Sequence, residues 1–164
     1  MLFVTHLVVA ALLGRWSRLA PLWLVVGATI PDAVDKPLAM AGVVDLYHTV
    51  GHTALLLPLA VVVAVTGRTG LAVAVGWGSH LFLDALHIVI NGRPSDALFL
   101  GWPLVVPPTP LAIPPGEFMF YYLWSPSFFL ECLIWLVAVV VVAGELRARR
   151  SSGSGAEAGD VPQR

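Results

Sequence analysis

The chain has 164 residues, of which 58% are hydrophobic and only 12% are charged. Its mean hydropathy is +0.86, and an ordinary soluble domain would carry about 25% charged residues. The formal net charge of -1 leaves no basic excess to hold a phosphate backbone, so we expect no nucleic-acid partner. Composition therefore excludes an ordinary soluble domain and predicts an all-α, polytopic helical protein in a lipid bilayer.

Five apolar stretches follow one another along the chain, at residues 1–14, 19–31, 51–66, 70–90 and 128–144. A membrane-spanning helix needs about 20 apolar residues, so only the fourth stretch has a comfortable length. The first two would each extend about 20 Å as helices, and they either cross or form a short hairpin. We expect a bundle of four or five membrane segments in residues 1–146, followed by a disordered cytoplasmic tail at 147–164.

Positive residues indicate the orientation of this bundle. If all five stretches cross, one side receives Arg15, Arg18, Arg68, Arg147, Arg149 and Arg150. The other side receives only Lys36 and Arg93. Because cytoplasmic loops are enriched in Lys and Arg, we predict a multi-pass protein of the cytoplasmic membrane with a cytoplasmic C-terminus. Residues 32–50 and 91–127 are then extracytoplasmic.

The long connection at residues 91–127 is rich in proline and then in aromatic residues, which excludes one continuous helix. Its rings are Phe118, Phe120, Tyr121, Tyr122 and Trp124. Amphipathic rings favour the membrane interface, so we interpret them as an aromatic belt. A lid over a site is the alternative.

Three ionisable side chains interrupt the fourth apolar stretch, in GWGSHLFLDALH at residues 76–87. At about 100° per residue, His80, Asp84 and His87 share one face of a helix. An acid at the centre of a span costs about 2.5–3.5 kcal/mol on insertion scales. The three side chains should therefore face polar partners rather than lipid.

Two other motifs supply such partners, and both are predicted to lie toward the extracytoplasmic side of the membrane, as Asp84 and His87 are. YHTVGHT places His48 and His52 at i and i+4, which predicts one helical face, with Asp45 as the N-cap of that helix. IPDAVDKP supplies Asp32 and Asp35 in a segment whose prolines predict a turn.

Single residues keep simpler alternatives. His6 and Asp84 are each open to a structural hydrogen bond or pair with a neighbouring helix or histidine. Asp32 and Asp35 are open to a role as solvated turn acids. Glu131 suits an interfacial carboxylate, and Arg93 suits snorkelling to the headgroups.

Together, these side chains predict a divalent metal site, with zinc as the expected ion. Imidazole and carboxylate are natural zinc ligands, and a cation neutralises buried carboxylates. The expected ligands are His6, Asp32, His48, His52, His80 and Asp84. Asp35 and His87 would support the ligands or act as a general base.

The same motifs resemble the YdjM-like family of membrane-bound, metal-dependent hydrolases, also described as LexA-binding, inner-membrane-associated proteins. The resemblance covers roughly residues 1–105 and depends on THLVVA, IPDAVDKP, YHTVGHTALL, GWPL and above all GWGSHLFLDALH. The last motif keeps the family's Gly-aromatic-x-Ser-His-x-x-x-Asp pattern. The acidic turn departs from the family pattern, since the second acid comes one residue later as Asp35 and Lys36 replaces a histidine. The histidine block lacks the family's arginine and has a spacing of four instead of five.

The family is in turn similar to the all-helical zinc phospholipase C group and the single-strand nucleases of that fold. Those enzymes hold several zinc ions and use a His-x-x-x-Asp pair on a helix, which His80 and Asp84 match. The resemblance implies phosphoester hydrolysis.

The leading hypothesis is a membrane-bound hydrolase that cleaves an ester or phosphoester, lipid-derived substrates included, at this His/Asp metal site. A transporter of metal ions or protons is the first alternative, since intramembrane ionisable residues often line such paths. It would need polar groups toward the cytoplasmic side, where Ser17 and Thr66 are the nearest. The second alternative is a non-catalytic assembly protein whose polar residues only pair helices.

Overall fold

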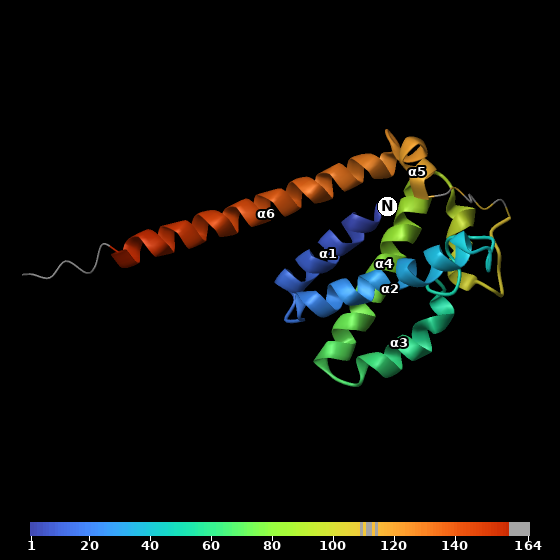
Figure 1. Ribbon diagram of the computed structural model, residues 1–164, viewed down its shortest axis with the longest axis horizontal. Helices are drawn as coiled ribbons and strands as arrows, with labels where there is room; N and C mark the ends of the chain where they lie inside the picture. Colours follow the sequence, from blue (N-terminus) through green and yellow to red (C-terminus); the bar gives the residue numbers. More distant parts are fainter. Residues whose placement is uncertain (109, 111–112, 114, 158–164) are drawn as a thin grey trace, which may run out of the picture.

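The computed structural model describes residues 1–108, 110, 113 and 115–157, and these residues form an all-helical fold (Figure 1). The elements in chain order are α1 (Phe3–Trp16), α2 (Pro21–Met40), the 3-10 helix η1 (Ala54–Leu56), α3 (Leu57–Ala64), α4 (Arg68–Ile90), the 3-10 helix η2 (Pro94–Gly101), α5 (Pro115–Tyr122) and α6 (Pro126–Glu157). The all-α part of the predicted fold class is confirmed. In Figure 1, α1, α2 and α4 pack together while α6 extends away from them.

Small residues allow the backbones of α2 and α4 to touch where the two helices cross. A Cβ added at Gly27 would overlap the Val73 carbonyl, and one at Gly76 would overlap the Leu24 carbonyl. Such close crossings are typical of helices that pack in a bilayer. The buried core beside the crossing consists of Ala10, Leu24, Ala28 and Ala72.

The predicted turn in IPDAVDKP is wrong, because α2 continues as a helix through Pro31 and Pro37 to Met40. Each proline removes one backbone hydrogen bond, a loss that neighbouring segments can offset. Asp32 and Asp35 therefore lie on one helical face, and Asp35 is held by backbone N–H groups of the following loop.

The predicted helix from about residue 48 is also wrong, because helical structure resumes only at Ala54. Thr49 N and Gly51 N donate to the Asp35 carboxylate, so they are not available to a helix. The N-cap of η1 is Thr53, whose side chain accepts a hydrogen bond from Leu55 N, so the predicted capping role of Asp45 is wrong. His48 and His52 accordingly lie in a loop.

α4 ends at a glycine, whereas α6 continues into the predicted tail. Gly92, at φ +77°, ends α4 with bonds from Gly92 N to Val89 O and from Arg93 N to Ile88 O, a Schellman motif. α6 runs on to Glu157 and so includes residues 147–157 of the tail that the sequence predicts to be disordered. Arg is a good helix former, and extending an existing helix is favourable. Residues 158–164 of the predicted tail lie outside the described residues.

Two helices are long and apolar enough to cross a membrane: α4, and α6 over Pro126–Arg150. The apolar helices Phe3–Trp16 and Ala54–Ala64 are shorter. Many large apolar side chains on α6 are exposed, as lipid contact would require, including Phe129, Leu133, Leu136, Val139 and Val140.

Two glycines of α4 provide a matched test of the close crossing. Gly76→Ala should destabilise the protein by about 1–3 kcal/mol, because the new methyl group meets backbone that cannot move aside. Gly78→Ala adds a methyl where nothing lies within 4 Å, so it should be neutral or slightly stabilising. Thermal unfolding of the purified protein in one detergent would measure both. Equal stability of the two variants would contradict the described crossing.

Candidate metal centre

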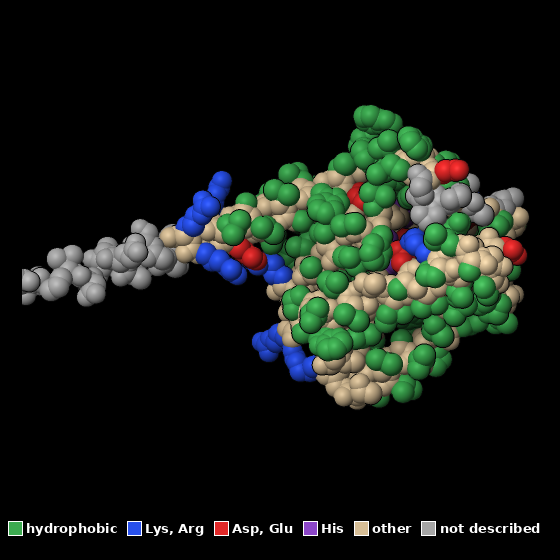
Figure 2. Space-filling model, viewed as in Figure 1, with side chains coloured by type: hydrophobic (Ala, Val, Ile, Leu, Met, Phe, Trp, Pro, Cys, Tyr) green, Lys and Arg blue, Asp and Glu red, His purple; other side chains and the backbone are tan. Residues whose placement is uncertain are grey.

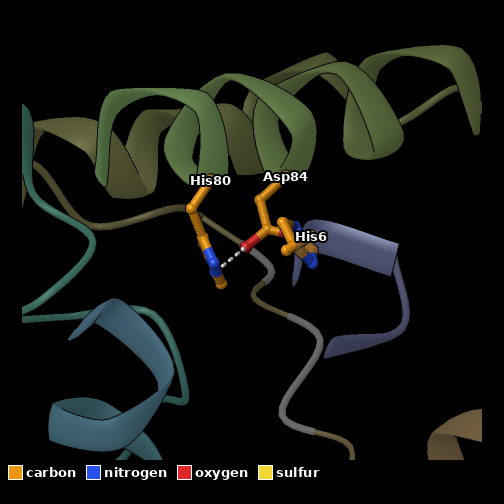
Figure 3. Close-up of side chains that lie close together, drawn as sticks. All are labelled: His6, His80 and Asp84. Carbon is orange, nitrogen blue, oxygen red and sulfur yellow. Dashed lines mark ion pairs between the residues drawn. The ribbon is translucent and has the colours of Figure 1, made fainter. Parts of the chain in front are cut away.

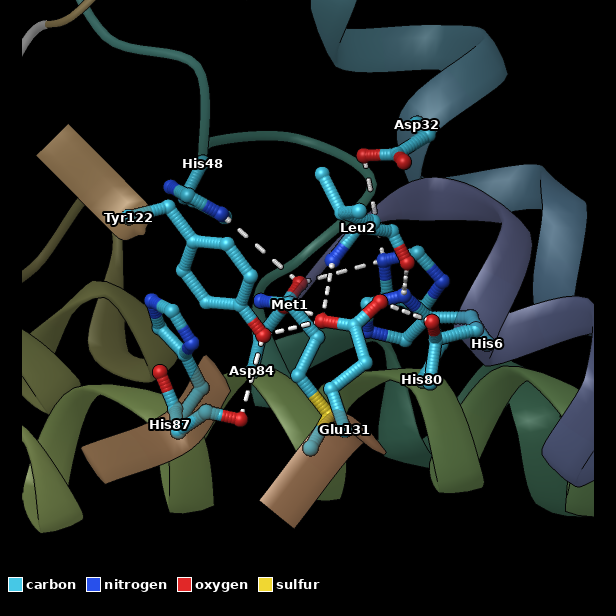
Figure 4. A network of polar contacts seen from close by, with 12 residues as sticks. Met1, Leu2, His6, Asp32, His48, His80, Asp84, His87, Tyr122 and Glu131 are labelled. Carbon is cyan, nitrogen blue, oxygen red and sulfur yellow. Dashed lines mark hydrogen bonds and ion pairs between the residues drawn. The ribbon is translucent and has the colours of Figure 1, made fainter. Parts of the chain in front are cut away.

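Four segments bring the predicted ligands together (Figure 4). α1 supplies His6, α2 supplies Asp32, α4 supplies His80 and Asp84, and the loop before η1 supplies His48 and His52. Within the described residues, three overlapping groups have donor atoms within 4.8 Å of one another: His6, His80 and Asp84; Asp32, His52 and His80; and His48, His52 and Asp84. All except His48 are buried.

Hydrogen bonds orient three of these imidazoles in the same way. His80 Nδ1 lies 2.6 Å from the Ala28 carbonyl oxygen, and His6 Nδ1 lies 3.1 Å from the Leu2 carbonyl oxygen. His52 Nδ1 lies 2.7 Å from Asp35 Oδ2. Because these oxygens only accept, each Nδ1 carries a proton and each Nε2 faces the cluster.

The facing atoms have the spacing of ligands around a single ion. His52 Nε2 lies 3.2 Å from His80 Nε2, and Asp84 Oδ2 lies 3.4 Å and 3.1 Å from these two nitrogens. Ligands about 2.0–2.2 Å from a tetrahedral zinc ion are separated by about 3.3–3.5 Å. Asp32 Oδ1 lies 3.5 Å from His52 Nε2 and 3.8 Å from His80 Nε2, and it also pairs with Lys36. Groups of three donors at this spacing could hold a divalent ion.

The second oxygen of Asp84 faces a different histidine. Asp84 Oδ1 lies 3.1 Å from His6 Nε2, and the ring of His6 stacks on that of His80 at 3.9 Å between centroids (Figure 3). His48 Nε2 lies 3.7 Å from Asp84 Oδ2 and comes from a half-exposed ring. Asp84 is thus the one carboxylate that contacts all four histidines of the cluster.

Asp35 holds His52 and the loop in place. This carboxylate is fully buried and accepts from His52 Nδ1, from Thr49 N at 2.6 Å and from Gly51 N at 2.8 Å. Burial raises the pKa of Asp35, but these hydrogen bonds outweigh it and keep the pKa below its usual value. With both oxygens engaged, Asp35 is placed to orient His52 rather than to face a substrate.

The surrounding carboxylates favour the protonated form of His52. Burial lowers its pKa, but hydrogen bonds with Asp32, Asp35 and Asp84 prevail and raise the pKa to about 10. The Nε2 atoms of His52 and His80 lie 3.2 Å apart, so a proton on His52 Nε2 is placed to be shared with His80. Metal binding would displace that proton.

A cavity of about 280 Å³ opens beside the cluster. Figure 2 shows charged side chains at the bottom of a hollow in an otherwise apolar face. Its polar wall includes His6, Asp32, His48, Asp84, His87 and Asn91, and its apolar wall includes Leu2, Phe3, Ile88, Phe99 and Phe118. Lys36 and Arg93 also line it; Lys36 pairs with Asp32 and Arg93 with Asp96.

Two predicted residues lie beside the donor set rather than in it. His87 lines the cavity and stacks on Tyr122 at 5.4 Å. Glu131 is buried, not interfacial, and accepts from Thr5 Oγ1, from the Tyr122 hydroxyl and from Leu2 N. Glu131 therefore ties α6 to α1 and α5.

The aromatic residues of α5 and of the turn that follows it divide between two roles. Phe120 and Trp124 are exposed, as a membrane belt would need. Tyr122 is buried, and Phe118 and Tyr121 line the cavity, as the lid alternative requires. No feature of the sequence distinguished Tyr122 from its neighbours, since its partners are His87 and Glu131 from distant segments.

No protein-family model, curated protein or solved structure matches the chain.

Asp35 gives a direct test of how the loop is held. Asp35→Ala should lower the free energy of unfolding by about 3 kcal/mol, because it leaves three buried donors without their acceptor. It should also weaken zinc binding about 10- to 100-fold, since His52 loses its orienting partner. Chemical unfolding and zinc titration in detergent would measure the two effects.

Asp45→Ala is the matched control, because Asp45 is an exposed acid of the same loop. It should behave as the wild type in both measurements. If Asp35→Ala also kept wild-type stability and zinc affinity, the structural role assigned to Asp35 would be wrong.

Proposed function

We propose that this chain is a membrane-embedded, metal-dependent hydrolase that cleaves an ester or phosphoester. The observation that supports it best is the convergence of His52 Nε2, His80 Nε2 and Asp84 Oδ2 at 3.1–3.4 Å from one another. His6, His52 and His80 are each anchored through Nδ1, so their Nε2 atoms face the Asp84 and Asp32 carboxylates. This is the orientation in which imidazoles bind a metal ion.

Named residues supply the parts that hydrolysis needs. Zinc would be held by one or more of three overlapping groups: Asp32, His52 and His80; His6, His80 and Asp84; and His48, His52 and Asp84. The bound ion would polarise a substrate oxygen and lower the pKa of water. Asp35 orients His52, and the cavity admits a substrate with a polar end and an apolar remainder. The resemblance to the YdjM-like hydrolases leads to the same reaction class.

The position of the site favours a closed pocket over a transport path. On α4, Ala72 lies between the cluster and Arg68, and the buried core around it is entirely apolar. A path for ions would need polar groups there. The cavity is found on the other side of the cluster, toward α5.

We also propose a multi-pass arrangement in the cytoplasmic membrane with the C-terminus in the cytoplasm. Arg15 of α1 pairs with Glu145 of α6, and Arg68 of α4 donates to the carbonyl of Arg18, which lies between α1 and α2. These contacts bring basic residues of separate segments to the same end of the protein. In Figure 2 most of the blue side chains lie toward the α6 end of the molecule, away from the hollow. By the positive-inside tendency that end is cytoplasmic and the cavity is extracytoplasmic.

Metal analysis of the purified protein tests the proposed site. The wild type should retain about one equivalent of zinc or more after zinc-replete purification and dialysis, whereas His80→Ala and Asp84→Ala should lose most of it. Asp45→Ala should match the wild type. A wild type without bound metal would contradict the proposal.

A panel of phosphodiesters and lipid esters tests catalysis. Activity should disappear with a chelator, return with zinc, and fall at least about 1,000-fold in Asp84→Ala. Zinc or proton uptake into proteoliposomes, without turnover of any ester, would favour the transporter alternative.

A further inference from the structure

His87 is the one cavity-lining histidine that the donor groups of the described residues do not include. It lies on α4 almost one turn beyond Asp84 and is only 8% exposed. Its ring is fixed by stacking on Tyr122, at 5.4 Å, and by contact with Phe118, at 5.8 Å. A buried ring held this firmly presents its two nitrogens in fixed directions.

The neighbouring amide determines which nitrogen carries the proton. The backbone N–H of Ser127 can only donate, so the Asn91 side-chain atom 3.1 Å from it must be the amide oxygen Oδ1. The other terminal atom of the Asn91 side chain is therefore the NH₂ group, Nδ2. Asn91 Nδ2 donates to Ser127 Oγ at 2.8 Å and lies 3.5 Å from His87 Nε2. Because an amide NH₂ only donates, His87 Nε2 accepts, and the ring proton resides on Nδ1.

The resulting N–H group is a buried donor without a protein partner. Among the described residues, no hydrogen-bond acceptor reaches His87 Nδ1. A buried donor in this condition costs about 1–3 kcal/mol, and such groups are rare unless they serve a ligand or an ordered water molecule. His87 lines the same cavity as His6, Asp32, His48 and Asp84.

We propose that His87 Nδ1–H is a hydrogen-bond donor for an anionic oxygen of the substrate's phosphoryl group. The inference deepens the proposed hydrolase function and rests on it. An ion held by the His/Asp cluster would bind one oxygen of the phosphoryl group, and His87, on the same helix as Asp84 and lining the same cavity, would hold another. His87 is then a binding residue that keeps its proton, rather than a base that removes one.

The protonation of His87 can be measured directly, without metal or substrate. In the full-length protein labelled with ¹⁵N-histidine in detergent micelles, long-range ¹H–¹⁵N spectra distinguish a protonated Nδ1 from a protonated Nε2. His87→Asn identifies the signal. A neutral ring with the proton on Nδ1 is expected, and a proton on Nε2 would overturn the proposal.

Calorimetric titration with inorganic phosphate tests the binding role. In zinc-loaded protein, His87→Phe should weaken phosphate binding about 10- to 100-fold, because it keeps a stacked ring and removes the donor. His87→Asn returns an N–H group close to the position of Nδ1 and should bind within a few-fold of the wild type. Phosphate affinity that is equal in His87→Phe and wild type would overturn the proposal.

Zinc titration of the same variants separates the two proposals. His87→Phe should bind zinc as the wild type does, because His87 lies outside the donor groups. If the wild type binds no zinc, the hydrolase function fails, while the ¹⁵N spectrum and phosphate titration of the metal-free protein still test the donor. If His87→Phe loses zinc, His87 is a ligand and the binding role is wrong.

Discussion

The burial of the Asp84 carboxylate in the middle of an apolar helix is the constraint on which the rest of the site depends. A charge at this depth is tolerated only with compensating partners. Asp84 obtains them from His6 of α1, from His48 and His52 of the loop and from His80 one turn earlier on α4. Three separate segments must therefore meet at one carboxylate, and the fold around α4 can be understood as the arrangement that makes this possible.

The close crossing of α2 and α4 brings those segments within reach. With Gly27 against Val73 and Gly76 against Leu24, the backbones touch, and His80 Nδ1 reaches the Ala28 carbonyl across the interface. The same contact that packs the helices thus determines which nitrogen of His80 faces the cluster. Helix packing and metal-ligand chemistry are coupled here, because a wider crossing would free His80 to turn.

The sequence was sufficient to predict an all-helical fold and the grouping of His80 and Asp84, because helical periodicity places i and i+4 on one face. It failed at Pro31, where α2 continues as a helix, and the Asp35 side chain accepts hydrogen bonds from Thr49 N and Gly51 N of the following loop. The same bonds prevent a helix at His48 and His52, so local propensity gave the wrong conformation there. Glu131 and Tyr122 could not be paired from sequence, since no local pattern relates residues that meet only through the packing of α5 and α6 against α1.

Three of the four imidazoles of the cluster are held by a hydrogen bond at Nδ1, so the fold itself sets the direction of their Nε2 atoms. His52 is fixed by Asp35, His80 by Ala28 O and His6 by Leu2 O. These anchors leave the Nε2 atoms facing the Asp84 and Asp32 carboxylates. Hydrogen bonds with Asp32, Asp35 and Asp84 raise the pKa of His52 to about 10, so its ring favours the protonated form and offsets the buried carboxylates. A metal ion at the same place would have to displace that proton, which would make its binding dependent on pH.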